Sequence, residues 1–393
     1  MCRHIVDDTM RRHAAKQPYT AAYIESTRLK RGAVSLGTKL KMASTQNQTR
    51  EVNVDVLIVG LGPAGTACGL ELNATGIKVL GIDRSHFPRD KICGDALPTE
   101  AQFEVDRLGL GQSCPEIRTT SRFAQWSPDG SPSYQHCFQT QAPIFQAIRR
   151  YDLDNWLVRQ CASEGLWMEF GWKVQVIQRD NKNKTWIASG SIHSKRGLRI
   201  GSFSIYTRCI VGCDGVGSVV RRATERSKET KTIVLASRCY RLVDPSRNHN
   251  QSTIAFRWQG TGAYSWRFAV PGGHNCGIAW LCQSDQPKIS GKAIIDLTRT
   301  LEPGCRDVRT MGLPILQSIP SIDGAEGIFL CGDAACLVDP LLGHGIDRAM
   351  KSGKLAGKAL RESLKKGEKP AETSFRYREN LAKQCNEWLN RCS

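Results

Sequence analysis

Three glycines near residue 60 have the spacing of a phosphate-binding turn. Gly60, Gly62 and Gly65 form the pattern G-x-G-x-x-G, with Pro63 and Ala64 between the second and the third glycine. In such a turn the first glycine permits the sharp bend, the second lets the backbone approach a pyrophosphate, and the third lets a helix pack closely on a strand. The chemistry that this pattern supports is the binding of a dinucleotide.

The elements that such a turn requires surround it in the expected order. Residues 54–59 form a β-branched run that predicts a buried strand, a helical pattern follows up to Gly76, and residues 78–82 predict a second strand. Asp83 ends this second strand about 20 residues after Gly60, where a carboxylate accepts hydrogen bonds from ribose hydroxyls. We assign Asp83 and its neighbour Arg84 to the cofactor site. The combination distinguishes this segment from an isolated glycine-rich turn.

Two later segments also read as a strand, a turn and a helix start. The first spans residues 209–222 and carries Asp214 and Gly215 at its turn. The second carries Gly332 and Asp333 at a strand end. It continues into a loop that opens a helix near Gly345 and contains Pro340, Gly343, His344, Gly345 and Ile346.

The first of these segments resembles a family motif. Its pattern G-x-D-G-x-x-S-x-V-R is similar to the second motif of the flavoprotein hydroxylase and geranylgeranyl reductase superfamily. The resemblance implies FAD as the cofactor, with Asp214 and Gly215 near its pyrophosphate and Asp333 at its ribityl or pyrophosphate region. It also implies that the 340–346 loop lies against the flavin pyrimidine, where a helix N-terminus stabilises the negative charge of reduced flavin.

Further segments resemble the geranylgeranyl reductase branch. Residues 87–97 read F-P-R-D-K-I-C-G-D-A-L, similar to a segment of that branch and of flavin halogenases, which implies that Cys93 and Gly94 lie near FAD. Residues 264–271 resemble the substrate-site motif Y-x-W-x-F-P, with two additional residues before the proline. Residues 340–346 resemble P-x-x-G-E-G-I, with His344 in place of Glu. Arg150 begins an R-x-x-L-D segment, which implies that it approaches FAD.

The catalytic candidates are Cys93, His344, Tyr264 and Trp266, and each has an alternative structural role. Cys93 is either a thiol beside the flavin or a small packed residue. Tyr264, Trp266 and Phe268 alternate, so a strand would point them to one face, as a substrate channel or as ordinary core. His344 is either a proton donor or a hydrogen-bonded loop histidine.

The resemblance implies an FAD-dependent oxidoreductase that reduces C=C bonds of an isoprenoid (geranylgeranyl-type) lipid. Hydride would pass from N5 of reduced flavin to one alkene carbon, and a proton would reach the other. The alternative is a monooxygenase (hydroxylase) or halogenase that acts on a small organic substrate with NAD(P)H and O₂, although the W-x-W-x-I-P segment of halogenases is absent. A second G-x-G-x-x-G motif is also absent, so electrons would come from transiently bound NAD(P)H or from an electron-donor protein.

The predicted fold is α/β, with a discontinuous Rossmann-type FAD-binding domain, a mainly antiparallel substrate domain and a C-terminal helix. We place the FAD-binding domain at 53–105, 145–228 and 322–366, and the substrate domain at 106–144 and 229–321. The C-terminal helix occupies 367–393. Residues 1–50 are polar and basic, which predicts a disordered or artefactual extension, with Met42 as an alternative start.

Composition limits the remaining classes. The net charge of the 393 residues is +18, yet no nucleic-acid motif is present, so we expect a basic surface for phosphates or anionic lipid and no nucleic-acid partner. No apolar run is long enough to span a membrane, so any membrane contact would be peripheral. The 16 cysteines form no C-x-x-C pair, which predicts reduced thiols, a cytoplasmic protein and no metal site.

Overall fold

The computed structural model describes most of the chain beyond the basic N-terminal segment. The described residues are 49–73, 75–107, 118–120, 122–126, 136–139, 145–224, 233–242, 252–257, 263–282, 289–316, 325–339 and 343–390. The predicted N-terminal extension therefore lies almost entirely outside the described residues, and so does Pro340. Among the described residues, no helix has the length and apolar character needed to cross a membrane.

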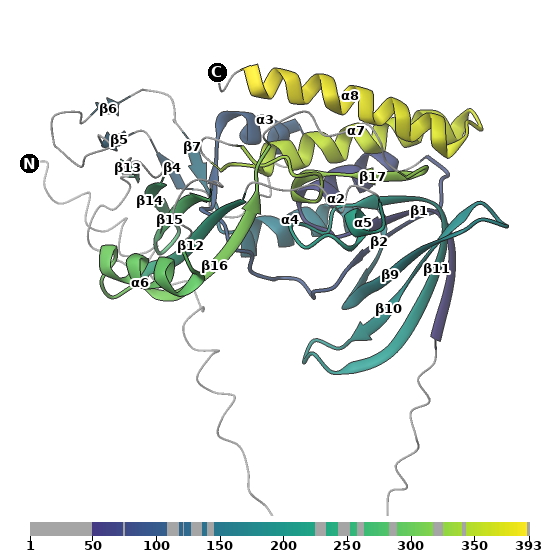
Figure 1. Cartoon of the computed structure of the whole chain (residues 1–393), viewed down its shortest axis with the longest axis horizontal. Coiled ribbons are helices and arrows are strands. Elements are labelled where there is room, and N and C mark those ends of the chain that lie inside the picture. The colour runs from purple at the N-terminus through teal and green to yellow at the C-terminus, as the bar shows by residue number, and fades with distance from the viewer. Residues whose placement is uncertain are drawn as a thin grey trace, which may run out of the picture. The chain divides into compact units, whose positions relative to one another are not determined.

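The first sheet has a parallel centre and an antiparallel edge (Figure 1). In spatial order its strands are β8 (Trp167–Phe170), β2 (Val79–Asp83), β1 (Thr49–Val59), β11 (Arg199–Gly212), β10 (Thr185–His193) and β9 (Trp172–Asp180), and β17 (Ile328–Leu330) pairs with β11. Strand β1 begins earlier than the predicted residue 54, because residues 49–53 pair in register with the first half of the long strand β11. The apolar runs of β1, β2 and β11 form the buried centre of this sheet.

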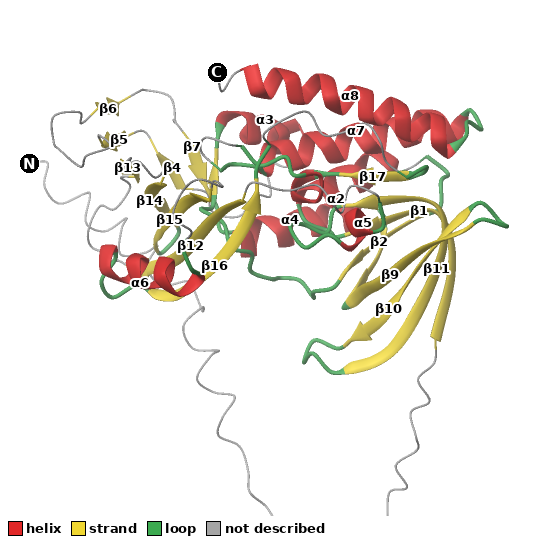
Figure 2. Ribbon diagram, viewed as in Figure 1, coloured by secondary structure: helices red, strands yellow, loops and turns green. Residues whose placement is uncertain are grey.

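Helices cover this sheet and bring the glycine turn close to the C-terminal part of the chain. Helix α2 (Pro63–Leu72) packs on α7 (Ile346–Lys365), and α8 (Pro370–Asn390) packs on α7 (Figure 2). A Cβ atom on Gly353 of α7 would lie 2.0 Å from the Ala64 carbonyl oxygen, so a glycine is required for this close approach. The shorter helices are α3 (Thr99–Arg107), α4 (Arg150–Ser163), α5 (Val219–Arg222) and the 3₁₀ turn η5 (Gly332–Ala335).

The second sheet is antiparallel except for one parallel pair, β13 with β5. Its order is β16 (Arg306–Pro314), β12 (Ile233–Leu242), β15 (Gly273–Cys282), β14 (Ala263–Val270), β13 (Ser252–Arg257), β5 (Arg122–Trp126) and β6 (His136–Gln139), and α6 (Gly291–Leu301) packs on it. A third, small sheet contains β3 (Ala96–Leu97), β7 (Phe145–Ala147) and β4 (Arg118–Thr120). The predicted fold class is confirmed: a Rossmann-type α/β part, a mainly antiparallel sheet and a C-terminal helix.

A buried ion pair joins the loop after β2 to the second sheet. The side chain of Arg238 on β12 is fully buried, and its guanidinium lies 2.5 Å from a carboxylate oxygen of Asp90. Asp307 lies 3.8 Å from the same guanidinium. Because a buried guanidinium without a carboxylate is strongly unfavourable, Asp90 fixes its loop against β12.

Replacing Asp90 with alanine is expected to lower the free energy of unfolding by about 3 kcal/mol, since it leaves Arg238 buried without its main counter-ion. The double variant Asp90→Ala/Arg238→Met is expected to be more stable than the single variant. Urea denaturation of both variants and of Arg238→Met measures the coupling between the two residues. If the losses in free energy of unfolding of the two single variants add up to that of the double variant, Asp90 and Arg238 are not coupled, which would contradict this account.

Candidate functional site

The glycine turn has the geometry that its sequence predicts. Gly60 has a φ of 97°, and a Cβ atom there would lie 2.3 Å from the Cys213 carbonyl oxygen. A Cβ atom on Gly65 would lie 1.9 Å from the Gly60 carbonyl oxygen. The space beside Gly62 is different, because the nearest atom to a Cβ there is a guanidinium nitrogen of Arg89 at 3.5 Å. The turn therefore leaves its backbone open at Gly62.

Two arginines face this opening and are held by one carboxylate. Arg150, the first residue of α4, is buried and binds Asp154 through Nε at 2.7 Å and through a terminal nitrogen at 2.8 Å. Arg89 binds Asp154 at 2.9 Å. Burial acts to raise the pKa of Asp154, but the charges of Arg150 and Arg89 outweigh it and lower the pKa. Two cations and an open glycine backbone suit a pyrophosphate.

Asp83 and Asp214, two of the three predicted acidic site residues, accept hydrogen bonds from nearby backbone N–H groups. Asp83 accepts hydrogen bonds from the backbone N–H of Leu61 at 2.9 Å and of Ser85 at 2.8 Å. Asp214 accepts a hydrogen bond from the Val219 N–H at 2.6 Å, and its other carboxylate oxygen is buried without a partner among the described residues. Such an oxygen can accept a hydrogen bond from a ligand hydroxyl. The residues present therefore fit a dinucleotide.

A cavity of about 220 Å³ opens next to this turn, between the second sheet and the helices and loops that carry the glycine turn, the Cys93 segment and the 343–349 segment. Its lining is mainly apolar and includes Pro63, Ile92, Ala96, Pro98, Val234, Ala236, Phe268, Ala279, Leu313, Val338 and Ala349. It also includes most of the predicted catalytic and flavin-facing residues, namely Cys93, Gly94, Arg150, Tyr264, Trp266, Asp333, Gly343, His344, Gly345 and Ile346. The cavity thus gathers residues from Pro63 to Ala349, which are 286 positions apart in the chain.

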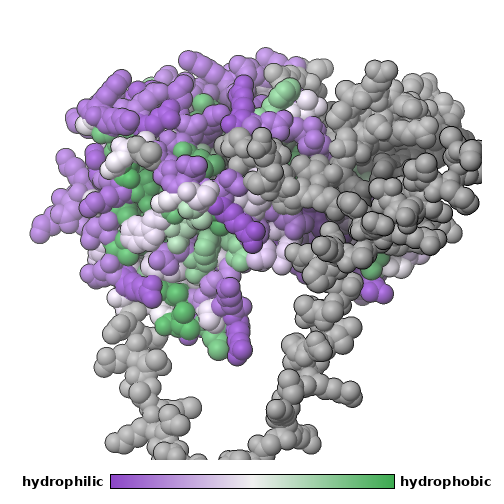
Figure 3. Space-filling model, turned by 180° about the vertical axis from the view of Figure 1, so that it is seen from behind, coloured by the Kyte–Doolittle hydropathy of each residue, from purple (hydrophilic) through white to green (hydrophobic). Residues whose placement is uncertain are grey.

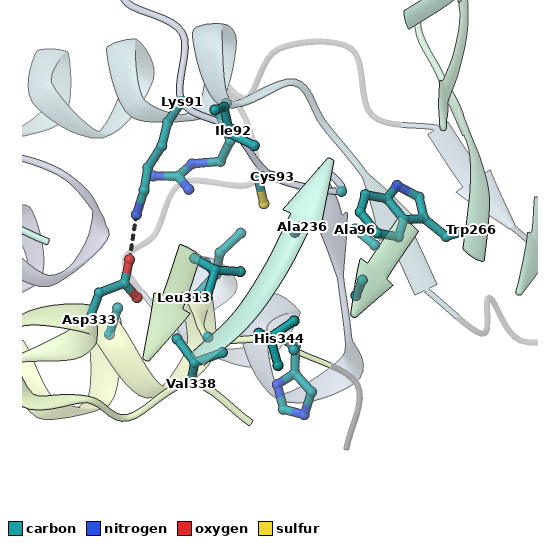
Figure 4. A pocket seen from close by; sticks show the side chains of 18 of the residues that line it. Lys91, Ile92, Cys93, Ala96, Ala236, Trp266, Leu313, Asp333, Val338 and His344 are labelled. Carbon is teal, nitrogen blue, oxygen red and sulfur yellow. Dashed lines mark hydrogen bonds and ion pairs between the residues drawn. The ribbon is translucent and has the colours of Figure 1, made fainter. Parts of the chain in front are cut away.

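An ion pair lies on one side of the cavity. Lys91 forms an ion pair with Asp333 at 2.8 Å, and Figure 4 shows this pair on the side opposite Trp266, with the Cys93 sulfur between them. Burial acts to raise the pKa of Asp333, but Lys91 outweighs it and lowers the pKa. Arg221 donates hydrogen bonds to the Asp333 and Ala334 carbonyl oxygens, which fixes η5 against the second motif.

An amide fixes the backbone of the Cys93 loop. Asn275 on β15 donates hydrogen bonds from Nδ2 to the Cys93 carbonyl at 2.7 Å and to the Asp95 carboxylate at 2.8 Å. Its Oδ1 accepts a hydrogen bond from the Trp266 indole at 3.0 Å. Asp95 also accepts from the Tyr240 hydroxyl at 2.6 Å, and burial still raises its pKa to about 6. The network holds the backbone of Cys93 in place relative to Trp266 on β14.

The aromatic wall consists of Tyr264, Trp266 and Phe268 on β14, and all three line the cavity. The Trp266 ring lies close to Gly277, where a Cβ atom would approach it to 2.1 Å. A Cβ atom on Gly343 would lie 2.9 Å from the Tyr264 hydroxyl. Gly277 therefore gives the Trp266 ring room within the sheet, and a side chain at Gly343 would narrow the cavity at Tyr264.

His344 lies between two buried carboxylates. Its Nδ1 is 3.0 Å from Asp347 and its Nε2 is 3.4 Å from Asp339, which also binds Arg348 at 2.5 Å. Two carboxylates and one arginine leave a net negative charge that a protonated imidazole neutralises. Burial acts to lower the pKa of His344, but Asp347 and Asp339 outweigh it and raise the pKa.

The His344→Gln variant is expected to change how stability depends on pH. Because the pKa of His344 is raised on folding, its contribution is complete below its unfolded pKa of about 6.5 and is lost as pH rises through the folded value. The wild-type protein should therefore exceed the variant in stability near pH 6, and this difference should shrink by about 1.4 kcal/mol per unit of raised pKa as the pH approaches 9. Thermal unfolding of both proteins from pH 5.5 to 9 measures this difference. A constant difference would contradict a protonated His344.

Not every predicted site residue lies at the cavity. The glycine-turn residues Gly60, Gly62, Ala64 and Gly65, with Asp83, Asp214, Gly215 and Gly332, lie outside its lining. The Arg84 side chain is exposed. Sequence reasoning did not single out Arg89, Lys91, Asp95 or Asn275. The first three occur in the recognised 87–97 segment, which was a usable signal, whereas no sequence pattern marks Asn275.

Comparison with known proteins also indicates an FAD-binding protein. The model of the FAD binding domain family matches residues 53–259, more than half of the chain. A menaquinone reductase of Mycobacterium tuberculosis is 29% identical over 78% of this chain and 76% of its own length. A digeranylgeranylglycerophospholipid reductase of Methanosarcina mazei is 26% identical over 80% and 76%.

Solved structures share the fold. A geranylgeranyl bacteriochlorophyll reductase-like protein of Thermoplasma acidophilum has a TM-score of 0.71 and 19% identity, over 85% of this chain and 84% of that one. A flavin-dependent brominase has a TM-score of 0.62 and 19% identity, over 84% of each chain. The resemblance to geranylgeranyl reductases is confirmed, and FAD is the cofactor that these findings support. The chain belongs to the FAD-binding domain family and is an FAD-dependent oxidoreductase.

Proposed function

We propose that this protein reduces C=C bonds in the isoprenoid chain of a lipid. The observation that carries the proposal is the mainly apolar cavity beside the dinucleotide turn, walled by Trp266 and its neighbours on β14. An apolar wall suits a hydrocarbon chain, which gains affinity from burial and offers no hydrogen bonds. Similarity to reductases named for menaquinone and for digeranylgeranylglycerophospholipid supports the same substrate class.

The cationic side of the cavity would hold the cofactor and the apolar side would hold the substrate. Arg89 and Arg150 are the groups for the pyrophosphate, and the Asp333–Lys91 ion pair lines the same cavity. FAD, when bound and reduced, supplies hydride from N5. The aromatic wall would hold the alkene in one orientation and exclude water.

Three groups at the cavity could deliver the proton that the second alkene carbon requires. Burial raises the pKa of Cys93, although Arg150 opposes this effect, so the thiol is protonated at neutral pH. Burial also raises the pKa of Tyr264. Each ring nitrogen of His344 faces a carboxylate, Asp347 or Asp339, which makes His344 the poorest of the three donors. The Cys93 sulfur lies between the Lys91–Asp333 pair and Trp266, that is, between the proposed cofactor side and the proposed substrate side (Figure 4). We therefore propose Cys93 as the proton donor, with NAD(P)H or a donor protein as the source of electrons.

The proposal is tested by anaerobic photoreduction of the purified protein, followed by rapid mixing with polyprenyl lipids, quinones or O₂. The expected result is return of the oxidised-flavin spectrum with a polyprenyl lipid, together with a product two mass units heavier per reduced bond. A long-lived flavin–oxygen adduct with O₂, and no saturated product, would instead favour the hydroxylase or halogenase alternative. If only quinones reoxidised the flavin, the substrate group would be the quinone ring and not an isoprenoid C=C bond.

A further inference from the structure

The turn between β10 and β11 exposes aliphatic side chains at the end of the first sheet. Leu198 is 65% exposed and Ile200 is 62% exposed. The neighbours of Ile200 on its face of β11 are Ser202 and Ser204, so this face is polar and Ile200 does not extend a core. We call residues 194–200 the β10–β11 tip.

The β10–β11 tip has a defined conformation. The Gly197 N–H donates to the Ser194 carbonyl at 2.8 Å, and the Ser194 N–H donates to the Leu198 carbonyl at 2.9 Å. Gly197 adopts a φ of 79°, which favours glycine at this position of the turn. The turn therefore presents Leu198 outward at no further cost in ordering the backbone.

The β10–β11 tip is also strongly basic. Lys195, Arg196 and Arg199 are exposed, and within the described part of the chain no carboxylate forms an ion pair with them. The stretch 181–213 carries six Lys or Arg residues and contains no Asp or Glu. Figure 3 shows apolar and hydrophilic residues side by side at the lower end of the molecule, where this tip projects.

We propose that the β10–β11 tip docks on a bilayer that contains anionic lipid, with Leu198 and Ile200 among the acyl chains and the three cations at the headgroups. Aliphatic side chains at the apex with cations around them match the layered chemistry of a membrane interface, which is apolar inside and anionic at its surface. An acidic protein would match the cations equally well. An acidic protein would not explain the two aliphatic side chains, however, because the apex of a turn offers no flat surface on which a protein partner could bury them.

The tip and the glycine turn lie at opposite ends of β11. Strand β11 runs from Arg199 to Gly212, beside the glycine turn, which is roughly 40 Å of extended chain. The tip is therefore a tether and does not feed substrate into the cavity. Docking is independent of the reaction proposed above, so either can fail without the other.

Co-sedimentation of the full chain with vesicles tests the proposal. Vesicles of phosphatidylcholine alone are compared with vesicles that contain about one third phosphatidylglycerol, at low and at high salt. We expect binding to the anionic vesicles only and weakening of it by salt. The Leu198→Ser/Ile200→Ser variant should bind at least tenfold more weakly. Lys195→Gln/Arg199→Gln should bind about 25-fold more weakly, at about fivefold per cation.

Matched controls separate the tip from general surface properties. Leu242 is 64% exposed at the end of β12, so Leu242→Ser removes a comparable aliphatic side chain elsewhere. Lys182→Gln/Lys184→Gln removes two exposed cations from the β9–β10 turn, at the opposite end of β10. Both controls should retain binding within about twofold, and all variants should retain the thermal midpoint and the activity on a detergent-dispersed substrate.

Three outcomes would overturn the proposal. The first is an absence of wild-type binding to anionic vesicles. The second is unchanged binding of Leu198→Ser/Ile200→Ser. The third is binding to polyglutamate as tight as to vesicles, which would indicate an acidic protein partner. If the Leu198→Ser/Ile200→Ser or Lys195→Gln/Arg199→Gln variant lost activity on dispersed substrate, the tip would act on the reaction itself, and its role as a tether would also be contradicted.

Discussion

Gly62→Ala is expected to give a folded protein whose affinity for FAD is lower by about 30-fold, or about 2 kcal/mol. The added methyl group meets only ordinary contacts within the chain, with Arg89 at 3.5 Å and Asp154 at 3.9 Å. The φ of Gly62 is −78°, which alanine adopts freely. The loss would come from the phosphate, whose hydrogen bonds to the backbone are worth about 1.5–3 kcal/mol each and require close approach.

Flavin fluorescence titration of the apoprotein measures this affinity, and Gly291→Ala is the control. Gly291 begins α6 away from the cavity, and a Cβ atom there would meet only Thr310 at 3.6 Å. The control should bind FAD as the wild-type protein does. If Gly62→Ala keeps its thermal midpoint and its FAD affinity, the pyrophosphate does not lie on this turn.

Cys93→Ala is expected to slow oxidation of the reduced protein by substrate by about 100-fold or more, the usual contribution of a positioned acid. The thiol lies in the cavity, and Asn275 holds its backbone through a hydrogen bond of 2.7 Å. Reduction of the flavin by the electron donor should be unchanged, because this step needs no proton from Cys93. Anaerobic rapid mixing measures the two half-reactions separately.

Cys93→Ser should recover part of the rate, since a hydroxyl also donates a proton. Cys305→Ser, in the turn before β16, is the matched control and should be silent. An unchanged substrate step in Cys93→Ala would leave Tyr264 or water as the donor. A slower donor step as well would indicate that the variant had disturbed the Asp95–Asn275 network and with it the cofactor.

The geometry of the glycine turn could be predicted from the sequence because it depends on residues that are close along the chain. The spacing of Gly60, Gly62 and Gly65 fixes a turn whose clashes involve atoms a few residues away or in the next strand. The helix starts after Gly62 and Gly345 followed from the same local patterns. The pattern also predicted that alternate residues 264, 266 and 268 share a face, since strand periodicity is local.

What the sequence did not reveal are contacts that depend on how distant strands align. Asn275 reaches Cys93 only because β15 pairs with β12 and β14 in one register, and a slip of one residue would turn its side chain to the other face. The burial of Arg238 against Asp90 and the enclosure of His344 by Asp339 and Asp347 likewise arise from packing between separate segments. The sequence by itself predicted FAD as the cofactor and the geometry of the glycine turn. The tertiary structure alone decided which charged groups are buried, which titratable groups are protonated and how wide the cavity is. Burial and electrostatics depend on residues that are close in space but distant in the chain.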